Sequence, residues 1–247
     1  MRGLLQEYDL LAADGPVGRA VVTRVWGSAP RPEGASLLAT LDGRMAGSVS
    51  GGCVETAAAE AIREAITRGT AQKVSWGVTH ERAWEMGLSC GGTVEVWVEP
   101  SIRPELLDAA RRTSGSAVAT VIAGGAPSGS GLVVLEDGTQ HAVRGLSGVL
   151  CQRVAELATS ALRRMVSGTE SIETPDGPVE VFLEVYPRRP TLLVFGGVHI
   201  AMALVKIAGS LGYRTVVADG REGFLTRERF PDVDELILGW PEEAFKR

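Results

Sequence analysis

A cysteine and a carboxylate stand close together in the run Gly47–Glu55, which reads GSVSGGCVE. An apolar strand is expected to lead into Gly51 and Gly52, and Cys53 then falls in the first turn of a helix. The N-terminus of a helix has unpaired N–H groups and a partial positive charge, which bind anions and activate thiols. The run therefore predicts an anion cradle beside a reactive sulfur, with a buried structural cysteine as the alternative.

The helix after this run is predicted from the spacing of its apolar residues. They recur at helical intervals from Val54 to Ile66, and the polar residues of the same stretch fall largely on the other face. Gly69 follows as a C-cap. We therefore expect a helix of about four turns whose first turn holds Cys53.

The composition excludes several functional classes. The 247 residues have a formal net charge of −5 at pH 7 with scattered Arg and Lys, so a basic surface for nucleic acid or membrane lipid is not expected. No apolar stretch reaches the roughly 18 residues that span a bilayer, and residues 1–7 lack the pattern of a cleaved signal. Cys53, Cys90 and Cys151 form no disulfide framework. We expect a cytoplasmic protein with free thiols.

Two stretches of the chain repeat one order of elements. After an opening helix at 4–13, strands are expected at 18–26, 35–41, 44–50 and 94–98, with the helix before the last of them. Similar segments recur at 117–122, 132–135 and 179–184, which indicates an internal duplication with repeats at about 17–100 and 115–186. The second copy has VLCQ where the first has GCVE, so we expect it to be scaffold. A cleft between two copies is a natural ligand site.

The tail predicts a βαβ unit after a linker at 187–190. A strand at 191–195 leads into Gly196-Gly197-Val198-His199, a helix follows, and a second strand ends in Asp219. This is close to the dinucleotide fingerprint, but Val198 replaces the glycine that lets the backbone approach a pyrophosphate. We expect Val198→Gly to raise nucleotide affinity.

The predicted fold class is α/β. It combines an N-terminal α+β domain (1–187) that contains the duplication with a truncated, partial Rossmann-like parallel βαβ domain (188–247), whose third strand is expected at 235–240. Because a bare strand edge favours pairing, we also expect a homodimer.

Four motifs in this order resemble the XdhC/CoxI family: the run Gly27–Ala35 (GSAPRPEGA), the run Gly47–Glu55, the triplet Cys90-Gly91-Gly92, and the Rossmann-like tail. Members of that family are accessory proteins of molybdenum hydroxylases such as xanthine dehydrogenase and carbon monoxide dehydrogenase. The resemblance implies a chaperone rather than an enzyme. Such a protein binds the molybdenum cofactor (molybdopterin form), protects it during sulfuration by a cysteine desulfurase, and delivers it to an apo molybdenum hydroxylase.

The resemblance also implies roles for single residues. Arg31 would bind a phosphate of the cofactor through two N–H groups, with a solvated loop arginine as the alternative. Ser28 would donate to the same anion or only shape the turn. Cys53 would ligate molybdenum or carry a persulfide, since a soft thiolate suits both. Glu55 would pair with Arg31, accept a proton, or favour the helix N-terminus by its charge. The other expected cofactor contacts are Gly34, Ser50, Gly51, Gly52, Cys90, Gly91, Gly92 and, in the tail, Gly196, His199 and Asp219.

Two other functions stay open. One is an NAD(P)-dependent oxidoreductase whose cofactor binds to the tail. The other is a nucleotide-sensing interaction protein without catalysis. In a working dinucleotide site Asp219 would bind a ribose hydroxyl. Val198, the short tail and the lack of a catalytic base in it argue against the oxidoreductase, and leave Asp219 a role in a turn or cap.

Overall fold

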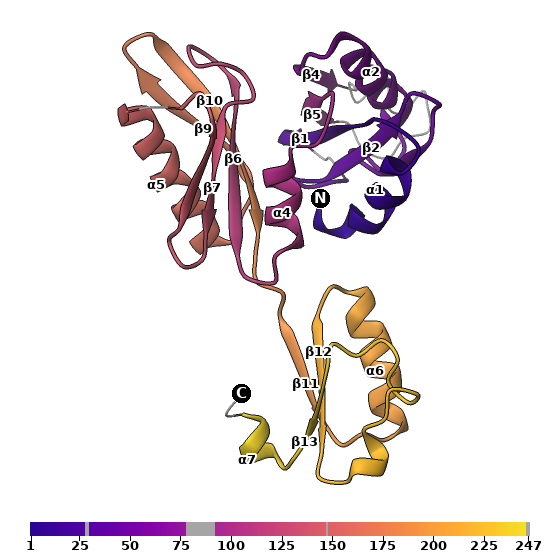
Figure 1. Ribbon diagram of the computed structural model, residues 1–247. Helices are drawn as coiled ribbons and strands as arrows, with labels where there is room; N and C mark the ends of the chain where they lie inside the picture. The colour runs from indigo at the N-terminus through magenta and orange to yellow at the C-terminus, as the bar shows by residue number, and fades with distance from the viewer. Residues whose placement is uncertain (28–29, 78–91, 147, 246–247) are drawn as a thin grey trace. The chain divides into compact units, whose positions relative to one another are not determined.

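The computed structural model describes residues 1–27, 30–77, 92–146 and 148–245. Contacts divide the chain into an N-terminal unit, Met1–Pro187, and a C-terminal unit, Arg188–Arg247. The N-terminal unit contains two antiparallel sheets of five strands, and the C-terminal unit a parallel sheet of three strands (Figure 1). Among the described residues, no helix is long and apolar enough to cross a membrane.

The first sheet is built around β1 (Val17–Gly27), whose first seven residues are all buried. It pairs antiparallel with β2 (Ser36–Thr40) on one side and β5 (Gly92–Glu99) on the other, giving the order β3-β2-β1-β5-β4. The predicted helix is α2 (Glu55–Arg68), and it ends as expected at Gly69, where φ is +67°. The opening helix expected at 4–13 is present as an α-helix, and a 3-10 turn precedes it. The other elements are η1 (Arg2–Leu4), α1 (Leu5–Ala12), β3 (Met45–Gly47) and β4 (Gln72–Gly77).

The second sheet repeats the first, element by element. Its strand order is β8-β7-β6-β10-β9, which is the order of the first sheet with each strand replaced by its counterpart. The predicted internal duplication is therefore confirmed. A short helix, α4 (Pro104–Arg111), precedes the second copy. The elements of that copy are β6 (Ser116–Ala123), β7 (Gly131–Leu135), β8 (Gln140–Arg144), α5 (Gly148–Arg164), β9 (Gly168–Thr174) and β10 (Gly177–Tyr186).

The match between the copies extends to a loop. In the first copy the N–H of Gly34 donates to the carbonyl of Val22 at 2.8 Å, and in the second that of Gly129 donates to the carbonyl of Val121 at 2.8 Å. Both glycines have positive φ, +88° and +83°. Since this conformation favours glycine, both copies keep one at this turn.

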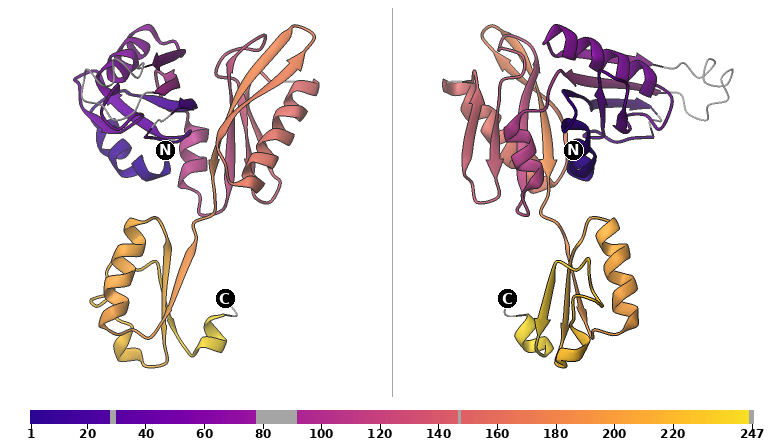
Figure 2. Two further views of the ribbon diagram at one scale, coloured as in Figure 1. Left: turned by 180° about the vertical axis from the view of Figure 1, so that it is seen from behind. Right: turned by 45° about the vertical axis from the view of Figure 1, so that its right-hand side comes forward.

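Each sheet carries one long helix, α2 or α5, and the two sheets pack on each other, with α1 and α4 packed against both of them. Buried residues of α2 form one cluster with the first sheet, and buried residues of α5 form another with the second. Between the sheets, Val21 and Trp97 meet Ile122 and Phe182. The layers are thus helix, sheet, sheet, helix, and Figure 2 shows α5 along the face of the second sheet that is turned away from the first.

The C-terminal unit has the predicted Rossmann-like βαβ order. β11 (Thr191–Phe195) pairs parallel with β12 (Arg214–Asp219), which pairs parallel with β13 (Glu235–Leu238). The connecting helix α6 (His199–Ser210) buries Ala201, Val205 and Ala208. The two remaining helices are η2 (Glu222–Phe224) and α7 (Pro241–Ala244).

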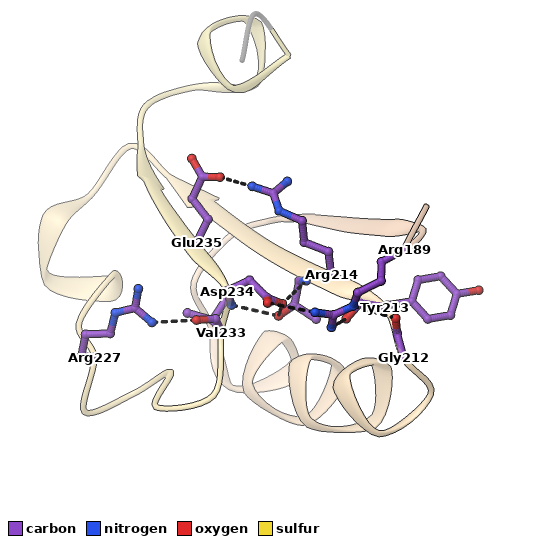
Figure 3. A network of polar contacts seen from close by, with 9 residues as sticks. Arg189, Gly212, Tyr213, Arg214, Arg227, Val233, Asp234 and Glu235 are labelled. Atoms are coloured by element: carbon purple, nitrogen blue, oxygen red, sulfur yellow. Dashed lines mark hydrogen bonds and ion pairs between the residues drawn. The ribbon is translucent and has the colours of Figure 1, made fainter. Parts of the chain in front are cut away.

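A polar network fixes the start of this unit to its sheet (Figure 3). Arg189 donates from Nε to the carbonyl of Gly212 at 3.1 Å and from Nη2 to that of Tyr213 at 2.6 Å. The carboxylate of Asp234 lies 3.5 Å from Nη1 of Arg189 and accepts from the N–H of Thr215 at 2.7 Å. Arg189 is therefore bound into the C-terminal unit.

Candidate functional site

Cys53 lies on an exposed loop between β3 and α2. β3 ends at Gly47, earlier than the strand expected to reach Ser50, and α2 begins at Glu55 with Val54 as its N-cap. Cys53 thus precedes the helix by two residues, and its expected place in the first turn was wrong. Its side chain is exposed, which excludes the alternative of a buried structural cysteine.

The carboxylate of Glu55 organises this loop. Its Oε1 accepts hydrogen bonds from the hydroxyl of Ser48 at 2.7 Å and from the N–H groups of Ser50 at 2.9 Å and Gly51 at 3.0 Å. Its Oε2 accepts from the hydroxyl of Ser50 at 2.7 Å and the N–H of Gly52 at 2.8 Å. Two further N–H groups point at the same carboxylate, those of Val49 and Val54.

The expected anion cradle is therefore already filled. The amide N–H groups that would receive an external anion donate instead to the side chain of Glu55, so the prediction of an open amide-lined mouth was wrong. Ser50 is also turned inward, because it is buried and its hydroxyl accepts from the N–H of Cys53 at 3.0 Å. Gly51 and Gly52 have φ of +84° and +125°, which explains both glycines by the path of the loop.

Hydrogen bonding keeps Glu55 ionised. Burial alone would raise its pKa, but the donors of Ser50 and Ser48 favour the charged form and lower the pKa to about 2. A carboxylate with this pKa is a weak proton acceptor near neutral pH. No ion pair joins Glu55 to Arg31 in the described part of the chain. Of the three predicted roles, only the electrostatic one at the helix start agrees with this geometry.

A second loop lies beside the first. A Cβ built on Gly51 would stand 3.4 Å from Cγ of Pro30, so the loop that carries Arg31 touches the loop that carries Cys53. Arg31 itself is exposed. Gly92 pairs with Gly27 across β5 and β1, at the end of the sheet where the Arg31 loop begins. Parts of three sequence motifs thus meet at one end of the first sheet.

The same loop reaches the second repeat. A Cβ on Gly34 would lie 3.3 Å from Oγ of Ser167, and a Cβ on Gly168 would lie 3.2 Å from Oε2 of Glu33. Burial raises the pKa of Glu33 above its ordinary value. Glu33 is thus a titratable group at the site that the sequence reasoning did not single out, although it stands inside the quoted run GSAPRPEGA.

Three predicted residues, Ser28, Cys90 and Gly91, lie outside the described residues. Cys151 is partly buried and lines a hollow of about 870 Å³ along α5, apart from Cys53. A second hollow of about 640 Å³ is lined by Arg103 and Ser130, among others, and neither hollow includes Cys53. Within the described ranges, no group of three or more His, Cys, Asp or Glu side chains could hold a metal ion.

Of the predicted tail residues, Asp219 is held in a polar network by Gly197 and Arg221. The N–H of Gly197 donates to Oδ2 of Asp219 at 2.9 Å, and Arg221 donates from Nε and Nη2 to the two carboxylate oxygens, each at 3.0 Å. The hydrogen bonds from Arg221 hold the pKa of Asp219 well below its usual range. Because both oxygens are taken, Asp219 fits the predicted turn role better than ribose binding.

The glycines at the start of α6 are explained by backbone geometry. A Cβ on Gly197 would clash with the carbonyl oxygen of Phe224, and Gly196 has φ of +101°. Val198 is the N-cap of α6 and is 39% exposed, and His199 is the exposed first residue of the helix. Val198 therefore lies at the surface where a pyrophosphate would approach.

Comparison with known proteins shows which families and proteins this chain resembles. Residues 10–77 match the XdhC and CoxI family, and residues 192–245 match the XdhC Rossmann domain. The chain is 26% identical over 232 residues to a probable xanthine dehydrogenase subunit of Bacillus subtilis (strain 168), covering 91% of this chain and 66% of that protein. It is 39% identical over 80 residues to the "Molybdenum cofactor insertion chaperone PaoD" of Escherichia coli (strain K12), covering 31% of this chain and 24% of that protein.

A solved structure has the same fold. A crystal structure of a xanthine dehydrogenase from Bacillus halodurans superposes with a TM-score of 0.73 at 23% identity, covering 100% of this chain and 70% of that one. The chain spans 66% and 24% of the lengths of the two curated relatives. The match to the XdhC and CoxI family precedes the match to the XdhC Rossmann domain, which is the order that the motifs predict.

Proposed function

We propose that this protein is an accessory chaperone that binds the molybdenum cofactor, protects it during sulfuration and delivers it to an apo molybdenum hydroxylase of the xanthine or carbon monoxide dehydrogenase type. The cofactor is its cargo, a cysteine desulfurase supplies the sulfur, and the protein itself is a maturation factor rather than an enzyme. The homodimer expected from the edge of the parallel sheet is part of this proposal.

The observation that carries the proposal is the exposed thiol of Cys53 on a hydrogen-bonded loop. A thiolate is a soft ligand that suits molybdenum, and an exposed position lets a large cofactor reach it. Residues that hold the loop, above all Glu55, reduce the conformational freedom that binding would otherwise have to remove.

Arg31 is the group that we assign to the anionic end of the cofactor. The amide N–H groups of the Cys53 loop are occupied by Glu55, so a phosphate needs another donor. Arg31 is exposed on the adjoining loop, and a guanidinium binds phosphate through two parallel N–H donors. The cofactor would thus lie across the two touching loops, with its metal at Cys53.

The nucleotide-based alternatives have less support. A dinucleotide site on the tail needs open N–H groups at the glycine turn and a free carboxylate after the second strand. Here the N–H of Gly197 and both oxygens of Asp219 are bonded to each other or to Arg221. We therefore favour the cofactor chaperone.

The proposal is tested by the metal content of protein purified from cells that make the cofactor. We expect molybdenum to co-purify with the wild-type chain and to be lost in Cys53→Ser. Cys151→Ser is the matched control, because Cys151 is partly buried in the second repeat, and it should retain the metal. Wild-type protein without molybdenum, or Cys53→Ser that retains it, would contradict the proposal.

A further inference from the structure

The start of α2 is held in an unusual way. Helices commonly begin with a Ser, Thr, Asp or Asn whose side chain binds the first free N–H groups. The N-cap here is Val54, which makes no side-chain cap hydrogen bond. The first helical residue, Glu55, instead reaches back over the preceding loop and binds its N–H groups.

The loop depends on this carboxylate. N–H groups of consecutive residues converge on one point only when the backbone bends sharply, and Gly51 and Gly52 supply the bend with positive φ. If the carboxylate were removed, these donors would lose their acceptor, and unpaired polar groups are costly where they are partly buried. The loop would then rearrange or bind another anion.

We propose that Glu55 is a positioning residue, whose carboxylate holds the loop of residues 48–54 from within and so fixes how Cys53 is presented at the surface. The side chain acts as a built-in anion that fills the amide cluster and excludes external anions from it. This inference rests on the proposed function only for the importance of Cys53, because the arrangement of the loop is independent of the cofactor.

Chemical rescue tests the inference. Glu55→Ala leaves the amide cluster without its carboxylate, and sodium acetate offers the same group in solution. The readout is the rate at which a bulky maleimide alkylates Cys53, followed by mass spectrometry of the peptide that contains it. We expect the rate to rise at least about tenfold in Glu55→Ala, as for the loss of one charge-assisted hydrogen bond. Acetate should return the rate to the wild-type value in a saturable way, whereas chloride at equal ionic strength should not.

Glu60→Ala is the matched control. Glu60 lies on the same helix, is exposed and contacts Arg63 at 3.8 Å. In Glu60→Ala, Cys53 should be alkylated at the wild-type rate with or without acetate. Glu55→Gln provides a second variant of nearly native size. Its amide keeps one acceptor oxygen but presents an NH2 donor where the second oxygen of Glu55 accepts hydrogen bonds, so Cys53 should be alkylated faster than in the wild type. Because the side chain still fills the site, acetate should not change this rate.

Two results would overturn the inference: wild-type alkylation rates in both Glu55 variants, or a faster rate in Glu55→Ala that acetate leaves unchanged. Because no molybdenum is used, failure here leaves the cofactor proposal standing. If acetate rescues Glu55→Ala but the wild-type protein purifies without molybdenum, the cofactor proposal is wrong and the role of Glu55 stands.

Discussion

Two carboxylates of this chain are held ionised by several hydrogen-bond donors each. Glu55 collects hydroxyl and N–H donors from the loop before it, and Asp219 is bound by Arg221 and Gly197. Each acid follows a glycine-rich motif and could be taken for a reactive group. These hydrogen bonds give both acids a structural explanation. In the proposed function the cofactor is bound instead by Cys53 and Arg31, which are both exposed.

The lowered pKa of Glu55 predicts how stability depends on pH. The pKa is about 2 in the folded chain against an ordinary value of 4.5, so the carboxylate stabilises the fold fully above about pH 4.5 and loses this contribution as the pH falls toward 2. We expect the free energies of unfolding of the wild type and Glu55→Gln to differ most at pH 7, and the difference to shrink between pH 4.5 and 3. Urea denaturation at several pH values measures the difference, and a gap that is independent of pH would argue against this assignment.

At this scale the sequence identifies residues but not their partners. Cys53, Glu55 and Arg31 are found from residue type and spacing. The direction of the loop N–H groups cannot be predicted in this way. It depends on the positive φ angles of Gly51 and Gly52, which the apolar pattern does not reveal. The partial burial of Glu33 against the second repeat was also missed, because the contact with Gly168 joins residues far apart in the sequence.

At the scale of elements, the two repeats end their long helices differently. α2 ends at Gly69 with φ of +67°, whereas α5 is followed by Met165 with φ of +56°. The left-handed conformation is strained for any residue with a Cβ. The second repeat therefore keeps a strained backbone at the position where the first uses glycine.

Met165→Gly is predicted to stabilise the protein. Relief of the left-handed strain should raise the free energy of unfolding by about 1 kcal/mol, and little packing is lost because Met165 is 68% exposed. Gly69→Met should lower it by a similar amount. Urea unfolding of both variants measures the effect, and a destabilised Met165→Gly protein would refute the strain argument.

The tail also yields a prediction at this scale. The sequence alone predicts that Val198→Gly raises nucleotide affinity, but Asp219 is still bound by Arg221 in that variant. We now expect Val198→Gly to leave NAD⁺ affinity unchanged, and Val198→Gly/Arg221→Ala to raise it. Isothermal titration calorimetry compares the two, and tighter binding by the single variant would show that Val198 alone is the obstacle.

The elements themselves are largely readable from the sequence. Alternating and helical apolar patterns place the central strands and α2, and Gly69 ends the helix where expected. The ends of β3 and the start of α2 were misplaced, because Ser48–Val54 is held by polar side-chain contacts that an apolar pattern does not reveal.

At the scale of the whole N-terminal unit, a buried ion pair joins the repeats. Arg19 on β1 is fully buried and donates from Nη2 to Oε2 of Glu184 on β10 at 2.5 Å. The hydroxyl of Tyr186 donates to Oε1 of the same carboxylate at 2.5 Å. Burial opposes the charge on Glu184, but Arg19 holds its pKa below the ordinary value. The duplication was visible in the sequence, whereas this contact between copies was not, since Arg19 and Glu184 occur in strands read as apolar.

Breaking this pair should destabilise the unit more than removing both partners. Arg19→Met leaves the buried carboxylate of Glu184 with the N-terminal ammonium of Met1, 3.7 Å from Oε1, as its remaining cation. We expect a loss of about 3 kcal/mol in the free energy of unfolding. Arg19→Met/Glu184→Met should recover a large part of it. Guanidinium denaturation of the single and double variants gives the comparison, and additive losses would mean that the two side chains do not depend on each other.

X-ray absorption at the molybdenum K edge compares the cofactor bound to the wild-type protein with the same cofactor free in solution. If Cys53 ligates the metal, we expect one sulfur neighbour more around molybdenum in the bound cofactor than in the free cofactor. Identical sulfur coordination in the two samples would contradict contact between Cys53 and the metal.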